Sequence, residues 1–234
     1  MEIIDSVGFR CTLVAKFCMA QSSKQECCEV VLARGVHFFS ATKPLAGVCL
    51  KNMSSTQFSI AKPDPGEYAP SYEKYVSLIS GGDLLSILDR QMNQVVRLFA
   101  GRSEADGDSR YLPEKWSVKE VLGHIIDTER IMAYRALRIA RGDKTPMEGF
   151  EQDDYVRNGP FTHCRLSDLV EEFMHVRRAT VALFRNLDES AITRKGMANK
   201  HEVTARALAY IIAGHELHHR RIVEEKYFAT THRP

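Results

Sequence analysis

The chain has 234 residues, of which 44% are hydrophobic, so it can form one domain of ordinary size with a substantial core. Its 32 Lys and Arg against 30 Asp and Glu give a net charge of +2, which argues against a dedicated nucleic-acid-binding protein with a basic stripe. No apolar run is long enough to predict a membrane span. A charged fraction of 26% with 9% aromatic residues is typical of a globular chain.

Residues 1–52 differ in character from the rest of the chain. Because a disulfide framework would spread over the domain that it crosslinks, cysteines confined to one segment predict a reduced, cytoplasmic protein. A secretory signal is disfavoured because Glu2 and Asp5 are acidic where such a signal needs positive charge. Only Cys164 lies outside this segment, and the other five cysteines are Cys11, Cys18, Cys27, Cys28 and Cys49.

The same segment has no sustained helical or strand period. We therefore expect a poorly ordered extension that adds little to stability, and Met53 is a candidate translation start. A metal site within the extension is disfavoured because the spacing of its ligand-type residues fits no zinc template. Those residues are Cys27, Cys28, His37 and Cys49.

Caps and periodicity predict the first two long helices. Asp83 follows two glycines as an N-cap, and apolar residues then recur at helical spacing until Gly101. Ser117 and Glu120 have the spacing of a capping box, the strongest helix-start signal in the chain. The second helix is expected to end before Gly142.

Periodicity predicts a third helix from near Ser167 and a fourth from near Thr204. Strand signals are weak everywhere after Met53. Four amphipathic helices predict an all-α protein, and specifically a four-helix bundle.

The sequence divides into an extension (1–52), a strap with Pro and Gly (53–82), the bundle (83–228) and a short tail (229–234). The second and third helices are separated by residues 142–165. Antiparallel neighbours in a bundle need only about 2–8 connecting residues. The long connection therefore predicts a crossover between helices that run parallel.

Three histidines occupy positions where core residues are expected. His215 and His219 lie one turn apart on the apolar stripe of the fourth helix, and His124 lies on the apolar face of the second. Burying a polar group without a partner costs on the order of 1–3 kcal/mol, so three inward imidazoles indicate a shared metal more strongly than three separate core histidines. His218 falls on a polar face and is predicted to be exposed. The stripe consists of Leu208, Ile211, Ile212, His215, His219 and Ile222.

Two blocks, Lys115–His124 (KWSVKEVLGH) and Ala213–His219 (AGHELHH), resemble the DinB-like superfamily. That superfamily includes YfiT-type bacillithiol transferases and proteins described as metal-dependent hydrolases. The resemblance covers about Pro63 to Tyr227. It implies a four-helix bundle with a long crossover and a divalent metal, often zinc or nickel. The ligands that it implies are His124, His215 and His219.

The segment from His215 to His219 also matches the H-E-x-x-H pattern of zinc metallopeptidases. That function is disfavoured because Arg221 and Ile222 follow where a metzincin continues with Gly and His. No predicted strand precedes the helix to hold a peptide.

Three protein ligands leave an open metal position, which is typical of a catalytic site. A metal there lowers the pKa of a bound water or thiol. The resemblance favours transfer of a low-molecular-weight thiol to an electrophilic small molecule, and hydrolysis by metal-bound water is the alternative. A non-catalytic, metal-stabilised stress or binding protein is a third possibility. We expect a small-molecule substrate, no nucleic-acid or membrane partner, and a homodimer as a candidate assembly.

Two acids are candidate catalytic residues. Asp127 lies three residues after His124, although an exposed ion pair with Arg130 or Arg135 is the alternative. Glu216 could orient a ligand or move a proton, or could form a solvated salt bridge with Arg220.

The crossover and two arginine pairs carry further polar residues that could act on a substrate. Asp153, Asp154 and Tyr155 could close over a substrate, although solvation is the default for loop acids. The pairs Arg177–Arg178 and Arg220–Arg221 are predicted to be solvated helix faces.

Overall fold

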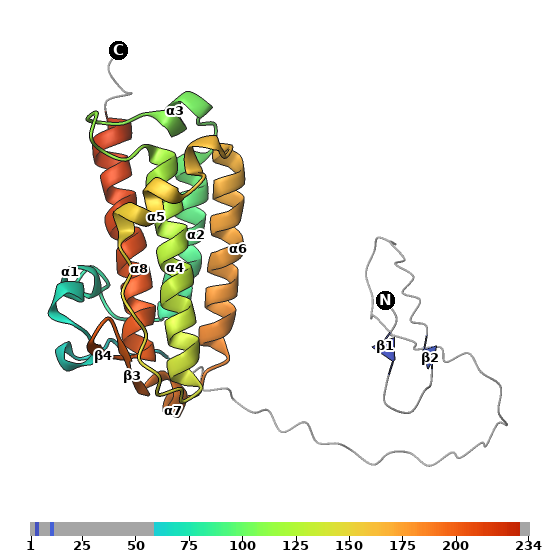
Figure 1. Cartoon of the computed structure of the whole chain (residues 1–234), viewed down its shortest axis with the longest axis vertical. Coiled ribbons are helices and arrows are strands. Elements are labelled where there is room, and N and C mark those ends of the chain that lie inside the picture. Colours follow the sequence, from blue (N-terminus) through green and yellow to red (C-terminus); the bar gives the residue numbers. More distant parts are fainter. Residues whose placement is uncertain (1–2, 5–9, 12–58, 230–234) are drawn as a thin grey trace, which may run out of the picture. The chain divides into compact units, whose positions relative to one another are not determined.

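A computed structural model describes residues 3–4, 10–11 and 59–229 (Figure 1). The chain divides into two units, Met1–Asn52 and Met53–Pro234. In the first unit, strands β1 (Ile3–Ile4) and β2 (Arg10–Cys11) pair antiparallel. The predictions made for the extension, its cysteines and the tail beyond residue 229 lie outside the described residues.

The second unit is a four-helix bundle, which confirms the predicted fold class (Figure 1). Its buried apolar residues form two clusters between the long helices. None of the described helices combines the length and hydropathy that a membrane span requires. The four are α2 (Leu84–Phe99), α4 (Val118–Ala140), α6 (Leu166–Arg185) and α8 (Ala205–Ile222), which continues as the π-helical η4 (Val223–Phe228).

The predicted capping box begins α4. The Ser117 hydroxyl accepts the Glu120 backbone N–H at 3.2 Å, and the Glu120 carboxylate accepts the Ser117 N–H at 2.6 Å. Thr204 caps α8 in the same sense, with its hydroxyl 3.1 Å from the Ala207 nitrogen. Both helices therefore begin where their local side-chain chemistry predicts.

Helices α4 and α6 run parallel, as the long connection predicted. Glu104 of the short helix α3 (Glu104–Asp108) binds the start of both. Its carboxylate lies 2.8 Å from the Lys119 ammonium and accepts the Leu166 backbone N–H at 3.0 Å. Helix α8 runs antiparallel to α4. The Tyr227 hydroxyl, beyond the C-terminal end of α8, donates to the carbonyl of Trp116, just before the N-terminal end of α4, at 2.6 Å.

The crossover is a folded segment rather than a plain loop. It contains α5 (Gln152–Asn158) and the 3-10 turn η3 (Phe161–His163), and it passes across α4 (Figure 1). Phe161 packs against α4 at Gly123, where a Cβ atom would lie 2.3 Å from the ring. Glycine at 123 therefore lets the crossover approach the helix beside His124.

A hairpin of β3 (Lys195–Ala198) and β4 (His201–Thr204) precedes α8 and follows α7 (Glu189–Ile192). The weak strand signals after Met53 did not indicate this hairpin, and the expectation that no strand precedes the fourth helix is wrong. The strands contain few β-branched residues, so period and propensity could not indicate them. The two turn residues, Asn199 and Lys200, both have positive φ, as a tight hairpin turn requires.

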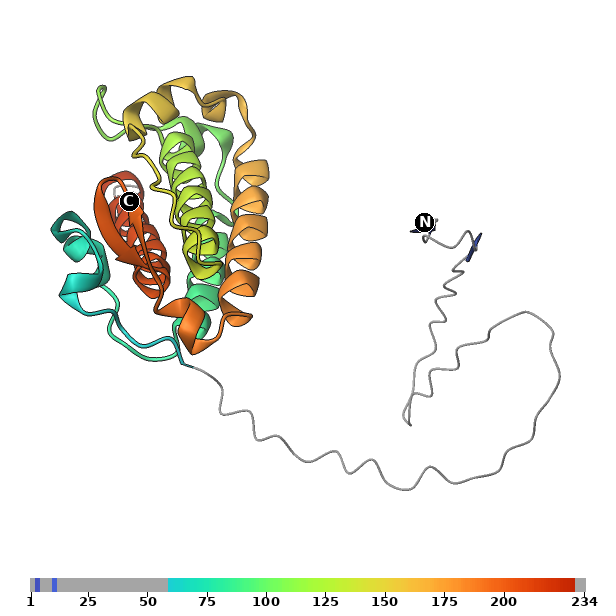
Figure 2. The same ribbon diagram turned by 60° about the horizontal axis from the view of Figure 1, so that its bottom comes forward.

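The strap packs along α8. It comprises η1 (Pro65–Glu67), η2 (Pro70–Tyr72) and α1 (Glu73–Val76), and Figure 2 shows α1 beside α8. The buried Glu67 accepts the Thr204 hydroxyl at 2.7 Å and pairs with Arg206. A Cβ at Gly214 of α8 would lie 2.0 Å from the Tyr75 carbonyl oxygen, so glycine there permits the close approach.

Two of the arginines predicted to be solvated are buried. Arg177 is 0% exposed and forms a bidentate pair with Glu129 of α4, with both shortest contacts at 2.8 Å. Arg220 is 9% exposed and binds Glu216, itself 1% exposed, at 2.9 Å. The spacing predicted the second pair correctly but not its burial. These ion pairs lie among the helices because each charge finds an opposite partner there.

Candidate metal centre

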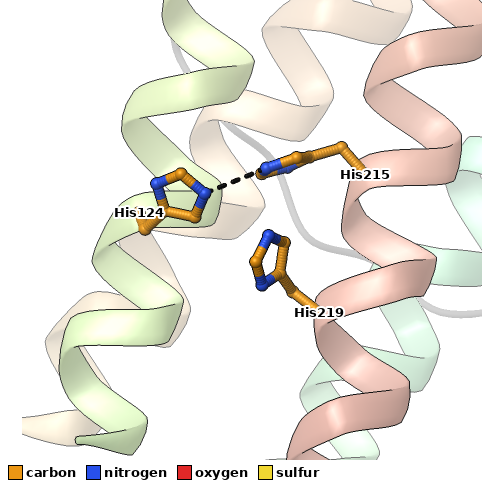
Figure 3. Close-up of side chains that lie close together, drawn as sticks. All are labelled: His124, His215 and His219. Carbon is orange, nitrogen blue, oxygen red and sulfur yellow. Dashed lines mark hydrogen bonds between the residues drawn. The ribbon is translucent and has the colours of Figure 1, made fainter. Parts of the chain in front are cut away.

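Three imidazoles converge between α4 and α8. His124 lies in the second turn of α4, and His215 and His219 project from successive turns of α8 (Figure 3). The Nε2 atoms of His124 and His215 are 3.0 Å apart, and one nitrogen from each of the three rings lies within 4.8 Å of the others. Two nitrogens bound to one metal ion at about 2.0–2.2 Å lie at most about 4.4 Å apart. The His124–His215 pair is within that limit, and the widest separation in the triad is slightly beyond it.

The site holds its imidazoles neutral. His124 is 3% exposed and His215 is 5% exposed, while His219 is partly exposed. Burial lowers the pKa of His124 to about 4. Burial, reinforced by the neighbouring histidines, lowers the pKa of His219 to about 3 and that of His215 well below its usual range. At neutral pH all three rings therefore offer a lone pair to a metal without first losing a proton.

The donor set fits a divalent metal. Tetrahedral ligands at about 2.0–2.1 Å lie roughly 3.4 Å from one another, which is between the 3.0 Å and 4.8 Å separations of the ring nitrogens. Side-chain adjustments of about 1 Å therefore suffice to place all three nitrogens on one ion. Imidazole nitrogen suits zinc and nickel, and three such ligands leave at least one position open.

Aromatic side chains fix the rings on both sides. Trp116 packs on His124 with ring centroids 4.8 Å apart. Tyr75 of the strap meets His215 edge-on at 5.2 Å. His218 also contacts Tyr75, at 5.5 Å, and is partly buried rather than exposed as predicted. It stays outside the triad, so the predicted register of α8 is correct.

Two hollows border the triad. The first, here called the tyrosine recess, has a volume of about 310 Å³ and includes Tyr72, Tyr75, Thr128 and Phe150 with His124 and His215. The second, here called the tryptophan recess, has a volume of about 330 Å³ and includes Tyr111, Lys115, Trp116 and Tyr227 with His219.

Asp153 of α5 lines both recesses. Of the two crossover acids named in the sequence analysis, Asp153 is the one at the site, and its charge favours the protonated form of His124. Glu151, just before α5, also lines the tyrosine recess. Asp154 pairs with Arg157 at 2.9 Å. Tyr155 meets Phe150 edge-on, and both line a separate groove.

The structure brings neither candidate catalytic acid into the recesses. Asp127 lies 3.6 Å from Arg130, which is the ion pair named as its alternative, and burial raises its pKa. Glu216 points into the bundle toward Arg220, and burial raises its pKa to about 7. One of its carboxylate oxygens, Oε2, has no hydrogen-bond partner.

Sequence reasoning missed the residues that shape the recesses. Tyr72 and Tyr75 fall within the strap and Thr128 within the second helix, and the sequence analysis singled out none of the three. Thr128 lies one turn after His124, so helical spacing could have found it. The strap tyrosines carry no local signal, because their position depends on the packing of α1 against α8.

Comparison with known proteins places the fold. The model of the DinB superfamily matches residues 87–223, and no curated protein matches the chain. One similar structure is YfiT from Bacillus subtilis, which is described as a probable metal-dependent hydrolase with an unusual four-helix bundle topology. It aligns with a TM-score of 0.59 and 17% identity, and the alignment covers 74% of this chain and 98% of YfiT. A mycothiol-dependent maleylpyruvate isomerase aligns with a TM-score of 0.50 and 14% identity over 58% of each chain. These two structures support the fold alone; the family match spans more than half of the sequence, and the chain belongs to the DinB superfamily.

Proposed function

We propose that this protein is a metal-dependent enzyme that transfers a low-molecular-weight thiol to an electrophilic small molecule. The observation that carries the proposal is the convergence of three neutral imidazoles, two buried and one partly exposed, with ligand atoms within 4.8 Å, beside two recesses. A structural metal site needs no space beside it, whereas a reaction between two molecules needs space for both.

His124, His215 and His219 would hold the ion, with zinc or nickel as the candidates. A divalent metal on neutral ligands keeps its full positive charge and favours the thiolate form of a thiol at neutral pH. The chain's own contribution is to fix the three rings. Trp116 and Tyr75 pack against two of them, and the helices set their spacing.

The protein would also orient the reactants. The recess walls exclude part of the solvent from the space beside the triad, which strengthens electrostatic interactions there. Asp153 lies at the boundary of the two recesses. From that position its carboxylate can accept a hydrogen bond from a molecule in either one.

Hydrolysis is the second candidate function. YfiT is described as a probable metal-dependent hydrolase, and the same open metal position would serve a water molecule. The maleylpyruvate isomerase is described as mycothiol-dependent, which is in line with a thiol reactant. Only thiol transfer uses two organic molecules, and so it accounts for two recesses beside the triad.

A paired assay separates the two functions. Purified protein loaded with zinc or nickel is incubated with a panel of low-molecular-weight thiols and electrophiles, and in parallel with ester and amide substrates without thiol. We expect thiol-dependent consumption of the electrophile that His219→Ala abolishes. Hydrolysis without thiol, with no conjugation by any thiol, would replace the transferase proposal by the hydrolase.

A further inference from the structure

Arg135 of α4 is a buried charge without a countercharge. The residue is only 3% exposed, yet its guanidinium contacts just the Glu148 carbonyl, at 2.6 Å, and the Met132 sulfur, at 3.7 Å. A buried charge is normally paired, because it loses its hydration without compensation otherwise. The other buried acidic and basic side chains that the structure describes all have a partner of opposite charge: Glu67 has Arg206, Lys119 has Glu104, Glu129 has Arg177, and Glu216 has Arg220.

The guanidinium of Arg135 also keeps a donor free. It has five N–H groups, and the two contacts above leave its Nε nitrogen without a partner. Among the described residues, the unpaired side-chain atoms that are fully enclosed belong to Thr128, Thr180 and Glu216. The Nε nitrogen is not one of them, so it retains contact with solvent and a ligand can reach it.

Arg135 lines a hollow of about 450 Å³ between α4 and the crossover, here called the arginine groove. Aromatic side chains form much of its wall, and two of them are unusually exposed: Tyr134 at 57% and Tyr155 at 46%. Tyr155 meets Phe150 with ring centroids 5.1 Å apart, and the Arg135 guanidinium lies 5.9 Å from the centre of the Phe150 ring. Such walls favour an aromatic ligand, and the volume is in the range of small-molecule sites.

Two further arginines line the groove, but acids already engage them. Arg130 pairs with Glu172 at 2.6 Å, and Arg138 pairs with Asp143 at 2.6 Å. Glu148 is the one acid in the lining; its side chain is exposed and forms no ion pair with Arg135. The unmet charge of the groove is therefore the positive charge of Arg135.

The arginine groove is separate from the metal centre. Arg135 follows His124 by eleven residues on α4, which is about 16 Å along the helix at 1.5 Å per residue. No histidine lines the groove, and Phe150 is the one residue that it shares with the tyrosine recess. A ligand in the groove would therefore not occupy the metal position.

We propose that the arginine groove binds a small aromatic carboxylate, with the carboxylate on the Arg135 guanidinium and the ring among Tyr134, Phe150 and Tyr155. The planar guanidinium matches a carboxylate in shape and charge. The ligand supplies the countercharge that the protein lacks, and its ring covers the exposed tyrosines. This site does not depend on the proposed thiol transfer.

Two matched probes test the role of charge. The first is 3-phenylpropanoate, which carries a ring and a carboxylate, and the second is 3-phenylpropanamide, which has nearly the same shape without the charge. Both are titrated by calorimetry into the full chain stripped of metal, because a carboxylate also binds metal ions. We expect the carboxylate to bind roughly 10-fold more tightly, since hydrogen bonds between charged groups are stronger. Equal affinities, or no binding of the carboxylate up to its solubility limit, would overturn the proposal.

Arg135→Met removes the guanidinium and keeps much of the side-chain volume. We expect it to weaken 3-phenylpropanoate roughly 10- to 100-fold. Arg138→Met is the matched control: it removes a guanidinium from the same groove, but one that Asp143 already engages, so the affinity should fall by less than about 3-fold. Equal weakening by the two variants would show general charge attraction and would overturn the assignment to Arg135.

Circular dichroism checks that each variant is folded. If Arg135→Met did not fold, the comparison of the two probes on the parent protein would still decide the proposal. His219→Ala should bind 3-phenylpropanoate as the parent does, and loss of binding there would place the ligand at the triad instead of in the groove. Failure of the thiol-transfer assay would count against the proposed function and leave this site unaffected.

Discussion

A substitution at Arg177 tests how the helices of the bundle are held together. Its side chain lies on α6 and is 0% exposed. It donates to both oxygens of Glu129 on α4 and to the Leu88 carbonyl and Gln91 side chain on α2, the last two at 3.2 Å and 3.3 Å. One guanidinium thus joins three of the four helices. Arg177→Met keeps much of the side-chain volume and removes every one of these contacts.

The magnitude follows from what remains after the substitution. Glu129 is 2% exposed, so its carboxylate would stay buried with no countercharge on Arg177. Removing one partner of such a pair costs about 3–5 kcal/mol. For a domain of this size each kcal/mol lowers the melting temperature by roughly 2–4 °C, so the expected loss is roughly 6–20 °C. The double variant Glu129→Leu/Arg177→Met replaces both partners and should recover most of the lost melting temperature.

Urea unfolding followed by circular dichroism and by the single tryptophan measures the loss. Arg178→Met is the matched control. The Arg178 side chain is exposed, so its replacement should change the free energy of unfolding by no more than about 0.5 kcal/mol. If Arg177→Met lay within about 1 kcal/mol of Arg178→Met, the buried ion pair would not hold the helices as argued.

Two further predictions concern the strap and pH. Gly214→Ala places a Cβ 2.0 Å from the Tyr75 carbonyl oxygen, so thermal melting should show a loss of roughly 1–3 kcal/mol in the free energy of unfolding. Gly66→Ala is the control: a Cβ at that position meets open space, so this variant should melt at the same temperature as the parent. Equal melting temperatures of the two variants would refute the close approach of the strap to α8. In metal-free protein the pKa values of His124 and His219, about 4 and about 3, lie below the unfolded value of about 6.5. The unfolded state therefore binds more protons, and stability should fall as pH drops from about 7 to 5; a urea midpoint that stayed constant or rose over that range would contradict neutral, buried rings.

Much of the bundle was predictable because its signals are local. Ser117 and Glu120 are three residues apart, and the capping box that they form begins α4 as expected. The histidines of α8 were predictable for the same reason, since spacing along one helix decides which residues share a face. The length of the 142–165 connection sufficed to predict that α4 and α6 run parallel.

The errors concern features that only distant partners create. Arg177 was predicted to lie on a solvated helix face as one of two adjacent arginines, but its burial depends on Glu129, 48 positions away. The hairpin before α8 depends on its turn residues and on packing rather than on strand propensity. Asp153 and the strap tyrosines reach the triad only through the tertiary fold. Sequence could name these residues but could not tell which of them meet.

The metal content of single-histidine variants tests the central claim most directly. Parent protein incubated with zinc or nickel and then dialysed should retain one ion per chain, and so should His218→Ala, whose ring lies beside the triad but outside it. His124→Ala, His215→Ala and His219→Ala should each lose the ion while staying folded, because the apolar core does not depend on the metal. Full retention by any one of these three variants would remove that histidine from the site. Unfolding of all three would show that the metal is structural rather than catalytic.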